Sequence, residues 1–261
     1  MPESWSFGVV ALLSAGVLIY GLAKTAMPGA GILAGTLIAA AIGPAAGSGF
    51  SLPLLLVGDV IALTRYRRGA NWPIIVGLLP GVLVGLCVSA AAFATLDRGM
   101  LTRFLGALIL LSVLLEVRRR MRGEVAAAAD GAPVAPAEPS TLARRVGVGF
   151  YGTLAGMTTL AANAGGAAMS LYLLRMRVPM LAFLGTSAWF WAIINVTKVP
   201  FAIPLGLITG DTLRADVLFL PFLLAGAALG VWLHPRMSQT FFSAAVLTLS
   251  GVAAVWLLVH G

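Results

Sequence analysis

The chain has 261 residues, of which 60% are hydrophobic and only 10% charged, and its mean hydropathy is +1.00. This composition argues against a soluble domain and predicts a polytopic, all-α membrane protein, because several apolar runs approach the ~20 residues that span a bilayer. The net charge of +8 does not indicate nucleic-acid binding, since the arginines cluster in short polar breaks between apolar runs, where the positive-inside bias puts them.

Apolar segments are expected in two groups that a polar linker separates. The first group covers residues 5–23, 29–43, 48–64, 72–95 and 100–117. The linker at 118–144 is rich in alanine, proline and glutamate and cannot bury a core. The second group covers residues 146–162, 164–177, 179–208, 213–233 and 238–259. We therefore predict a first transmembrane repeat over 1–117, a linker over 118–144 and a second repeat over 145–261.

The two groups resemble each other in sequence. The run GLAKTAMPGAG at 21–31 aligns without gaps to GMTTLAANAGG at 156–166, and DVIAL at 59–63 lies opposite NVTKV at 195–199. LLPGVLVG at 78–85 likewise resembles FLPFLLAGAALG at 219–230, and both contain the G-x-x-x-G spacing that is typical of closely packed helices. The common order of these matches predicts an internal duplication.

Arginine counting predicts the orientation of the chain. If the linker is cytoplasmic, twelve arginines lie inside and only Arg98, Arg103 and Arg214 lie outside. The C-terminus is then periplasmic, and the first segment pair of one half (5–43) is inverted relative to that of the other (146–177). Inverted repeats are typical of secondary transporters, with the binding site near the midplane. We expect a multi-pass protein of the bacterial inner membrane.

Helix-breaking residues interrupt the first segment pair of each half. Met27-Pro28-Gly29 interrupts one pair and Asn163-Ala164-Gly165-Gly166 the other, and segments 29–43 and 164–177 are short for a full span. We predict broken or re-entrant helical hairpins, which membranes tolerate only where protein or a water-filled cavity covers them. Helix N-termini at such breaks present free N–H groups and a positive dipole end, which favour an anion.

The chain has only two lysines, Lys24 and Lys198, and both lie inside long apolar runs. A charge at bilayer depth costs roughly 2.5–3.5 kcal/mol on insertion scales, so it needs a compensating role. We predict that the two lysines bind an anion. The alternative is that each lysine extends its head group to the membrane interface.

Further candidate binding residues lie beside the lysines and the breaks. Asn195 shares a helix face with Lys198. The hydroxyl and amide groups of the candidate threonines and asparagines can donate hydrogen bonds to an oxyanion. The alternative role of these side chains is hydrogen bonding between helices. The predicted substrate-binding residues are Lys24, Thr25, Pro28, Gly29, Thr158, Thr159, Asn163, Gly166, Asn195 and Lys198. Asp59 is predicted to be a counter-ion for a lysine or a proton-coupling group, and the alternative is a structural pair with Arg65.

No metal-ligand spacing, phosphate-binding loop or catalytic constellation stands in the sequence. We therefore expect no cofactor, no metal and no enzymatic activity. The expected partners are a small anion and the lipid bilayer, without nucleic acid; proton coupling and a homodimer stay open.

Together these motifs resemble the sulfite exporter TauE/SafE family of membrane transporters. The resemblance rests on GLAKTAMPGAG, on DVIALTRYRRGANW followed by LLPGVLVG, on LAANAGGAAMSLYLL and on FLGTSAWFWAIINVTKVPF. It implies duplicated halves and transport of a small sulfur-containing anion, such as sulfite, sulfoacetate or a related organosulfonate. Many relatives carry three glycines at the breaks, where this chain has Pro-Gly-Ala-Gly and Asn-Ala-Gly-Gly. We expect alternating access; the alternatives are an anion channel or a transporter of another small oxyanion or carboxylate.

Overall fold

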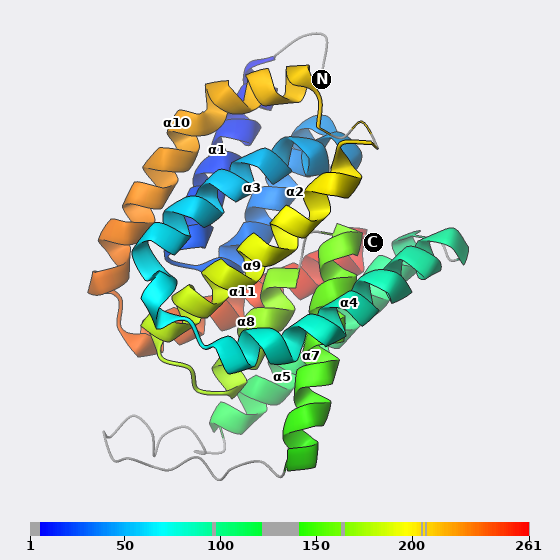
Figure 1. Ribbon diagram of the computed structural model, residues 1–261, viewed down its shortest axis with the longest axis vertical. Coiled ribbons are helices and arrows are strands. Elements are labelled where there is room, and N and C mark those ends of the chain that lie inside the picture. Colours follow the sequence, from blue (N-terminus) through cyan, green and yellow to red (C-terminus); the bar gives the residue numbers. More distant parts are fainter. Residues whose placement is uncertain are drawn as a thin grey trace. The chain divides into compact units, whose positions relative to one another are not determined.

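The computed structural model describes residues 6–95, 98–121, 141–162, 165–204, 206 and 208–260 (Figure 1). All regular secondary structure in these ranges is helical. The α-helices are α1 (Phe7–Thr25), α2 (Gly31–Ile42), α3 (Pro44–Tyr66), α4 (Trp72–Thr95), α5 (Arg98–Met121), α7 (Thr141–Ala162), α8 (Gly165–Arg175), α9 (Met180–Ala202), α10 (Gly210–Leu233) and α11 (Gln239–His260). Short 3-10 turns lie at η1 (Pro28–Ala30), η2 (Arg67–Gly69) and η3 (His234–Arg236).

Several of the described helices are suited to a bilayer. By length and composition, five stretches can cross a membrane: Phe7–Thr25, Ala46–Gly69, Met180–Pro200, Gly210–Arg236 and Gln239–Trp256. Shorter apolar helices cover Pro28–Ile42 and Trp72–Val88. The prediction of an all-helical, multi-pass membrane protein is confirmed, whereas the inverted relation of the two halves stays a prediction.

The helices form two compact units. One consists of Met1–Ile75 and Val178–Val246, and the other of Val76–Arg177 and Leu247–Gly261. Each unit therefore takes helices from both predicted halves. The division into 1–117 and 145–261 rests on sequence duplication rather than on compactness, so it stays a prediction.

Local chemistry explains the first helix and its break. The hydroxyl of Ser6 accepts a hydrogen bond from the N–H of Val9, which caps the start of α1. The helix ends at Thr25, just before the predicted break, because Pro28 lacks an N–H and disfavours helical geometry in the preceding residue. The second predicted break falls between α7 and α8, and its residues 163–164 lie outside the described ranges.

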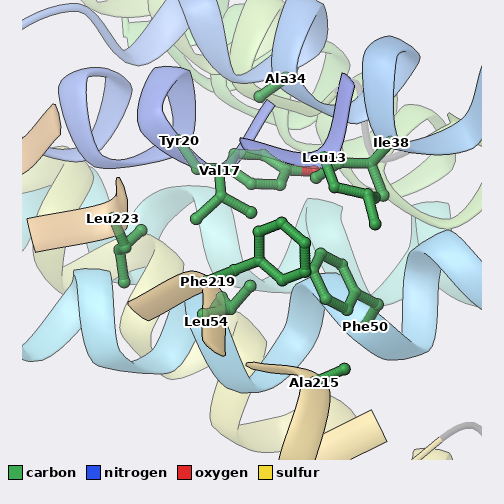
Figure 2. Packing of buried hydrophobic residues seen from close by; sticks show 10 residues of the cluster. All are labelled: Leu13, Val17, Tyr20, Ala34, Ile38, Phe50, Leu54, Ala215, Phe219 and Leu223. Atoms are coloured by element: carbon green, nitrogen blue, oxygen red, sulfur yellow. The ribbon is translucent and has the colours of Figure 1, made fainter. Parts of the chain in front are cut away.

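The core of the first unit is a cluster of apolar side chains from α1, α2, α3 and α10 (Figure 2). The rings of Phe50 and Phe219 meet edge to face, with centroids 5.5 Å apart. The buried members are Leu13, Val17, Tyr20, Ala34, Ile38, Phe50, Leu54, Ala215, Phe219 and Leu223. This packing fixes α1 against α10 and α3.

Glycines allow α1 and α10 to touch through their backbones. A Cβ added to Gly21 would collide with the backbone of Leu223 and Ala227, and one added to Gly226 would collide with the carbonyl of Leu18. The side-by-side course of the two helices is visible in Figure 1. The predicted close packing at this G-x-x-x-G motif is confirmed.

The second unit contains a matching glycine contact between α4 and α7. A Cβ added to Gly85 would collide with the carbonyl of Thr153, and one added to Gly156 with that of Val82. The alignment of 21–31 with 156–166 pairs Thr153 with Leu18 and Gly156 with Gly21. The alignment of the two Leu-Pro motifs pairs Val82 with Leu223 and Gly85 with Gly226. Equivalent residues thus make equivalent contacts, which supports an internal duplication.

Candidate functional site

Three helices of the first unit bring a lysine, a carboxylate and an amide together. The ammonium of Lys24, in the last turn of α1, forms an ion pair with Oδ1 of Asp59 on α3. Asn195 of α9 donates from Nδ2 to the other carboxylate oxygen at 2.7 Å. Asp59 and Asn195 are each 2% exposed and the Lys24 side chain 11%. A buried ion pair is therefore completed by an amide from the opposite half of the sequence.

Lys198 adds a second positive charge to this group. It lies three residues after Asn195 on α9, so the two side chains share a helix face. Lys198 lies close enough to Lys24 and Asp59 for the charges of both to act on it, repulsive from Lys24 and attractive from Asp59. We call Lys24, Asp59, Asn195 and Lys198 the lysine cluster. Its formal charge is +1, from two ammonium groups and one carboxylate.

The carboxylate of the cluster stands in the middle of an apolar span, whereas Lys24 and Lys198 stand near the ends of their own spans, Phe7–Thr25 and Met180–Pro200. Asp59 stands near the middle of the candidate span Ala46–Gly69, so an ammonium in contact with it lies away from the ends of that span. The structural pair with Arg65 that the sequence left open is not the contact observed here; Asp59 pairs with Lys24, and Arg65 lies over the ring of Tyr66.

A glycine makes room for the lysine stem. A Cβ added to Gly58, the residue before Asp59, would lie 3.0 Å from Cγ of Lys24. Carbon atoms pack best at about 3.5–4.0 Å, so any side chain at position 58 would displace the stem. Gly58 is thus part of the site, although no motif in the sequence pointed to it.

Hydrogen bonds from the hydroxyls of Thr25 and Tyr66 hold the end of α1, which carries Lys24, in position. Thr25 is fully buried, and its hydroxyl donates to the carbonyls of Ala227 at 3.0 Å and Gly21 at 3.1 Å. The hydroxyl of Tyr66 donates at 2.8 Å to the backbone carbonyl of Thr25, one of the last helix carbonyls, which lack partners within the helix. The hydroxyl of Thr25 thus links two helices in this structure; its role as a substrate ligand stays a prediction.

Other predicted binding residues occupy the two breaks. Pro28 and Gly29 form η1, directly after α1, and Gly29 is buried. Thr158 and Thr159 are buried near the end of α7, and Gly166 is the second residue of α8. These three residues belong to the second unit. Asn163 lies outside the described residues.

The hydroxyl of Thr158 donates within its own helix, to the carbonyls of Leu154 at 2.6 Å and Ala155 at 3.3 Å. This contact satisfies a buried hydroxyl without a ligand. Whether Thr158 and Thr159 also contact a substrate stays a prediction.

A second buried carboxylate lies on α10. Asp216 is 6% exposed, and neither of its carboxylate oxygens has a hydrogen-bond partner among the described residues. It precedes Phe219 by three residues and so shares a helix face with a member of the apolar cluster. Asp216 was not among the predicted site residues, although an acidic residue inside the apolar segment 213–233 is a signal visible in the sequence.

The lysine cluster can hold an anion by charge and by hydrogen bonding. Two ammonium groups and one amide supply donors, and the low dielectric of a buried site strengthens their attraction for a negative charge. Within the described residues, no group of three or more His, Cys, Asp and Glu side chains could hold a metal ion.

Comparison with known proteins identifies one family. A family model described as Sulfite exporter TauE/SafE matches residues 12–257, which include all four residues of the lysine cluster. Neither curated proteins nor solved structures give a match.

Proposed function

The chain belongs to the TauE/SafE sulfite exporter family, and we propose that it is a secondary transporter of a small sulfur-containing anion. The substrate class is sulfite, sulfoacetate or a related organosulfonate, moved across the bacterial inner membrane by alternating access. The observation that carries this proposal is the lysine cluster, in which Lys24 pairs with the buried carboxylate of Asp59 and the second lysine of the chain lies within electrostatic range of both.

The position of Asp59 supports anion binding over interfacial anchoring of the lysines. An ammonium that extends to the membrane surface would not contact a carboxylate in the middle of a span. Asp59 neutralises Lys24 and so lowers the free-energy cost of placing its charge among apolar helices. An incoming oxyanion would bind Lys198 and the amide of Asn195. It would also bind the ammonium of Lys24, either together with the Asp59 carboxylate or in its place.

Lysine suits a site that must also release its ligand. Its ammonium is a compact point charge, whereas an arginine fork holds an oxyanion at two points. In alternating access, the two repeats would rock against each other around the bound anion. The matching glycine contacts of α1 with α10 and of α4 with α7 support two repeats of similar build.

An anion channel, or a transporter of another small oxyanion or carboxylate, is the alternative. The two mechanisms differ in kinetics, since a transporter saturates and exchanges labelled for unlabelled substrate across the membrane. Counterflow of labelled sulfite or sulfoacetate in proteoliposomes distinguishes them. Flux that rises linearly with concentration and shows no counterflow would favour a channel.

A binding experiment tests the role of the cluster directly. Isothermal titration of the purified protein against sulfite, sulfate, sulfoacetate, taurine and simple carboxylates identifies the ligand. Lys198→Ala should weaken binding by about one to two decades, because one charge-assisted hydrogen bond is worth about 1.5–3 kcal/mol. Lys198→Arg should also impair transport, because the planar fork does not replace the ammonium.

Lys198 is the better test position, because removing Lys24 also leaves Asp59 without its ion pair. Arg214→Ala is the matched control, since Arg214 is 87% exposed and its ion-pair partner in the described part of the chain is the exposed Asp211, at 3.6 Å. Affinities of Lys198→Ala within a factor of two of wild type would refute anion binding at this cluster.

A further inference from the structure

Building on the transport function proposed above, we propose that the lysine cluster selects organosulfonates with a single negative charge over those with two. The formal charge of the cluster is +1, because Lys24 and Lys198 contribute two positive charges and Asp59 one negative charge. Asn195 adds hydrogen-bond donors and no charge. One monoanion therefore brings the occupied site to neutrality.

Asp59 is held in the cluster by contacts on both of its oxygens. Lys24 binds one oxygen and Asn195 the other, at 2.7 Å for the amide. The carboxylate is 2% exposed, so water does not screen its charge. A second negative charge on the substrate would therefore lie close to a fixed carboxylate in a low-dielectric site, where like charges repel strongly.

The other charged groups of the first unit do not change this balance. Thr25, next to Lys24, contacts Ala227 of α10, and Asp216 lies eleven residues earlier on that helix. At ~1.5 Å per residue this is about 16 Å along the helix axis. The remaining arginines and the other aspartate described in this unit are exposed: Arg65, Arg67, Arg68 and Arg236, and Asp211 with Arg214, which pair with each other. Exposed charges are screened within about 10 Å at ordinary salt.

Two ligands that differ by one charge test the proposal. Sulfoacetate and 2-hydroxyethanesulfonate have the same sulfonate and the same two-carbon chain, but one ends in a carboxylate and the other in a hydroxyl. Isothermal titration of the purified full-length protein at neutral pH and fixed ionic strength gives both Kd values. We expect the wild-type protein to bind 2-hydroxyethanesulfonate about tenfold more tightly, or better.

Changing the charge of the cluster should shift this preference in both directions. Asp59→Asn keeps the shape of the side chain and raises the formal charge to +2, so the ratio of the two Kd values should move at least about tenfold toward sulfoacetate. Lys198→Gln lowers the charge to zero, so sulfoacetate should lose more affinity than 2-hydroxyethanesulfonate. This second variant keeps the test valid if Asp59→Asn does not fold.

Asp216→Asn is the matched control. It makes the same chemical change at another buried carboxylate of the same unit, about 16 Å along the helix from the level of Lys24. The ratio of the two Kd values should stay within twofold of wild type.

Three results overturn the proposal. In the first, wild-type protein binds sulfoacetate as tightly as 2-hydroxyethanesulfonate, or more tightly. In the second, the ratio of the two Kd values is the same in wild type, Asp59→Asn and Lys198→Gln. In the third, neither sulfonate binds while a carboxylate or sulfate does, which refutes the proposed substrate class and this inference with it. The first two results leave anion transport by the lysine cluster intact, so the two failures are distinguishable.

Discussion

Removal of Lys24 alone should destabilise the protein far more than removal of its charge together with that of Asp59. In Lys24→Met, the Asp59 carboxylate remains 2% exposed, loses its ion pair and keeps the hydrogen bond from Asn195. Breaking a buried ion pair at one partner costs about 3–5 kcal/mol. Because 1 kcal/mol shifts Tm by about 2–4 °C for a chain of this size, Lys24→Met should lower Tm by about 6–20 °C.

The double variant Lys24→Met/Asp59→Asn should recover at least half of that loss. It removes the carboxylate charge that has lost its ion pair and keeps an amide oxygen that can accept the hydrogen bond from Asn195. Substitutions at neighbouring residues that share an interaction do not have additive effects on the free energy of unfolding. The cycle of single and double variants measures this coupling. Thermal unfolding of detergent-solubilised protein, followed by tryptophan fluorescence, supplies the four Tm values.

The exposed pair Asp211 and Arg214 is the control for this cycle. Their side chains are 80% and 87% exposed, so Arg214→Met and the double variant Arg214→Met/Asp211→Asn should each change the free energy of unfolding by less than about 1 kcal/mol. If the double variant at the buried pair is no more stable than Lys24→Met, the ion pair does not determine the stability of this region, and the reasoning is wrong.

Two further substitutions probe how Lys24 is positioned. Gly58→Ala should weaken anion binding about 3- to 10-fold, because its Cβ would lie 3.0 Å from Cγ of Lys24 and push the lysine stem off its preferred rotamer. Titration calorimetry measures the affinity. The control is Gly8→Ala, where nothing lies within 4 Å of the added Cβ, and this variant should bind the anion as tightly as wild type does. Equal affinities for the two alanine variants would show that the stem has room to spare. Tyr66→Phe should lower stability by about 1–3 kcal/mol, because the buried carbonyl of Thr25 loses its 2.8 Å hydrogen bond; an unchanged Tm would mean that another donor replaces the hydroxyl.

Features that depend on local chemistry could be predicted from the sequence. Apolar runs gave the helical membrane fold, and Pro28 marked the end of α1 because a missing N–H acts within a few residues. The glycine spacing in 219–230 predicted a close helix contact, and Gly226 makes one. Long-range matches between motifs also placed Asp59 opposite Asn195 in the alignment.

Features that depend on how helices cross could not be predicted in this way. The alignment did not show that Asp59 and Asn195 hydrogen bond to each other, because repeat equivalence carries no distance. Nothing in the sequence links Tyr66 to the carbonyl of Thr25, or Gly58 to the stem of Lys24. The composition of the two compact units is also a tertiary property, since each unit joins helices that are far apart along the chain.

The contact between α1 and α10 has a consequence for the order in which the protein is made. Thr25 and Ala227, which are joined by a hydrogen bond, are 202 residues apart in the sequence. At ~5–20 residues per second, a ribosome needs roughly 10–40 s to synthesise that stretch. The face of α1 that contains Gly21 is therefore without its α10 partner while the intervening helices are synthesised. Asp59 follows Lys24 after only 35 residues, so the ion-pair partner of Lys24 is synthesised early, long before α10 emerges to complete the unit.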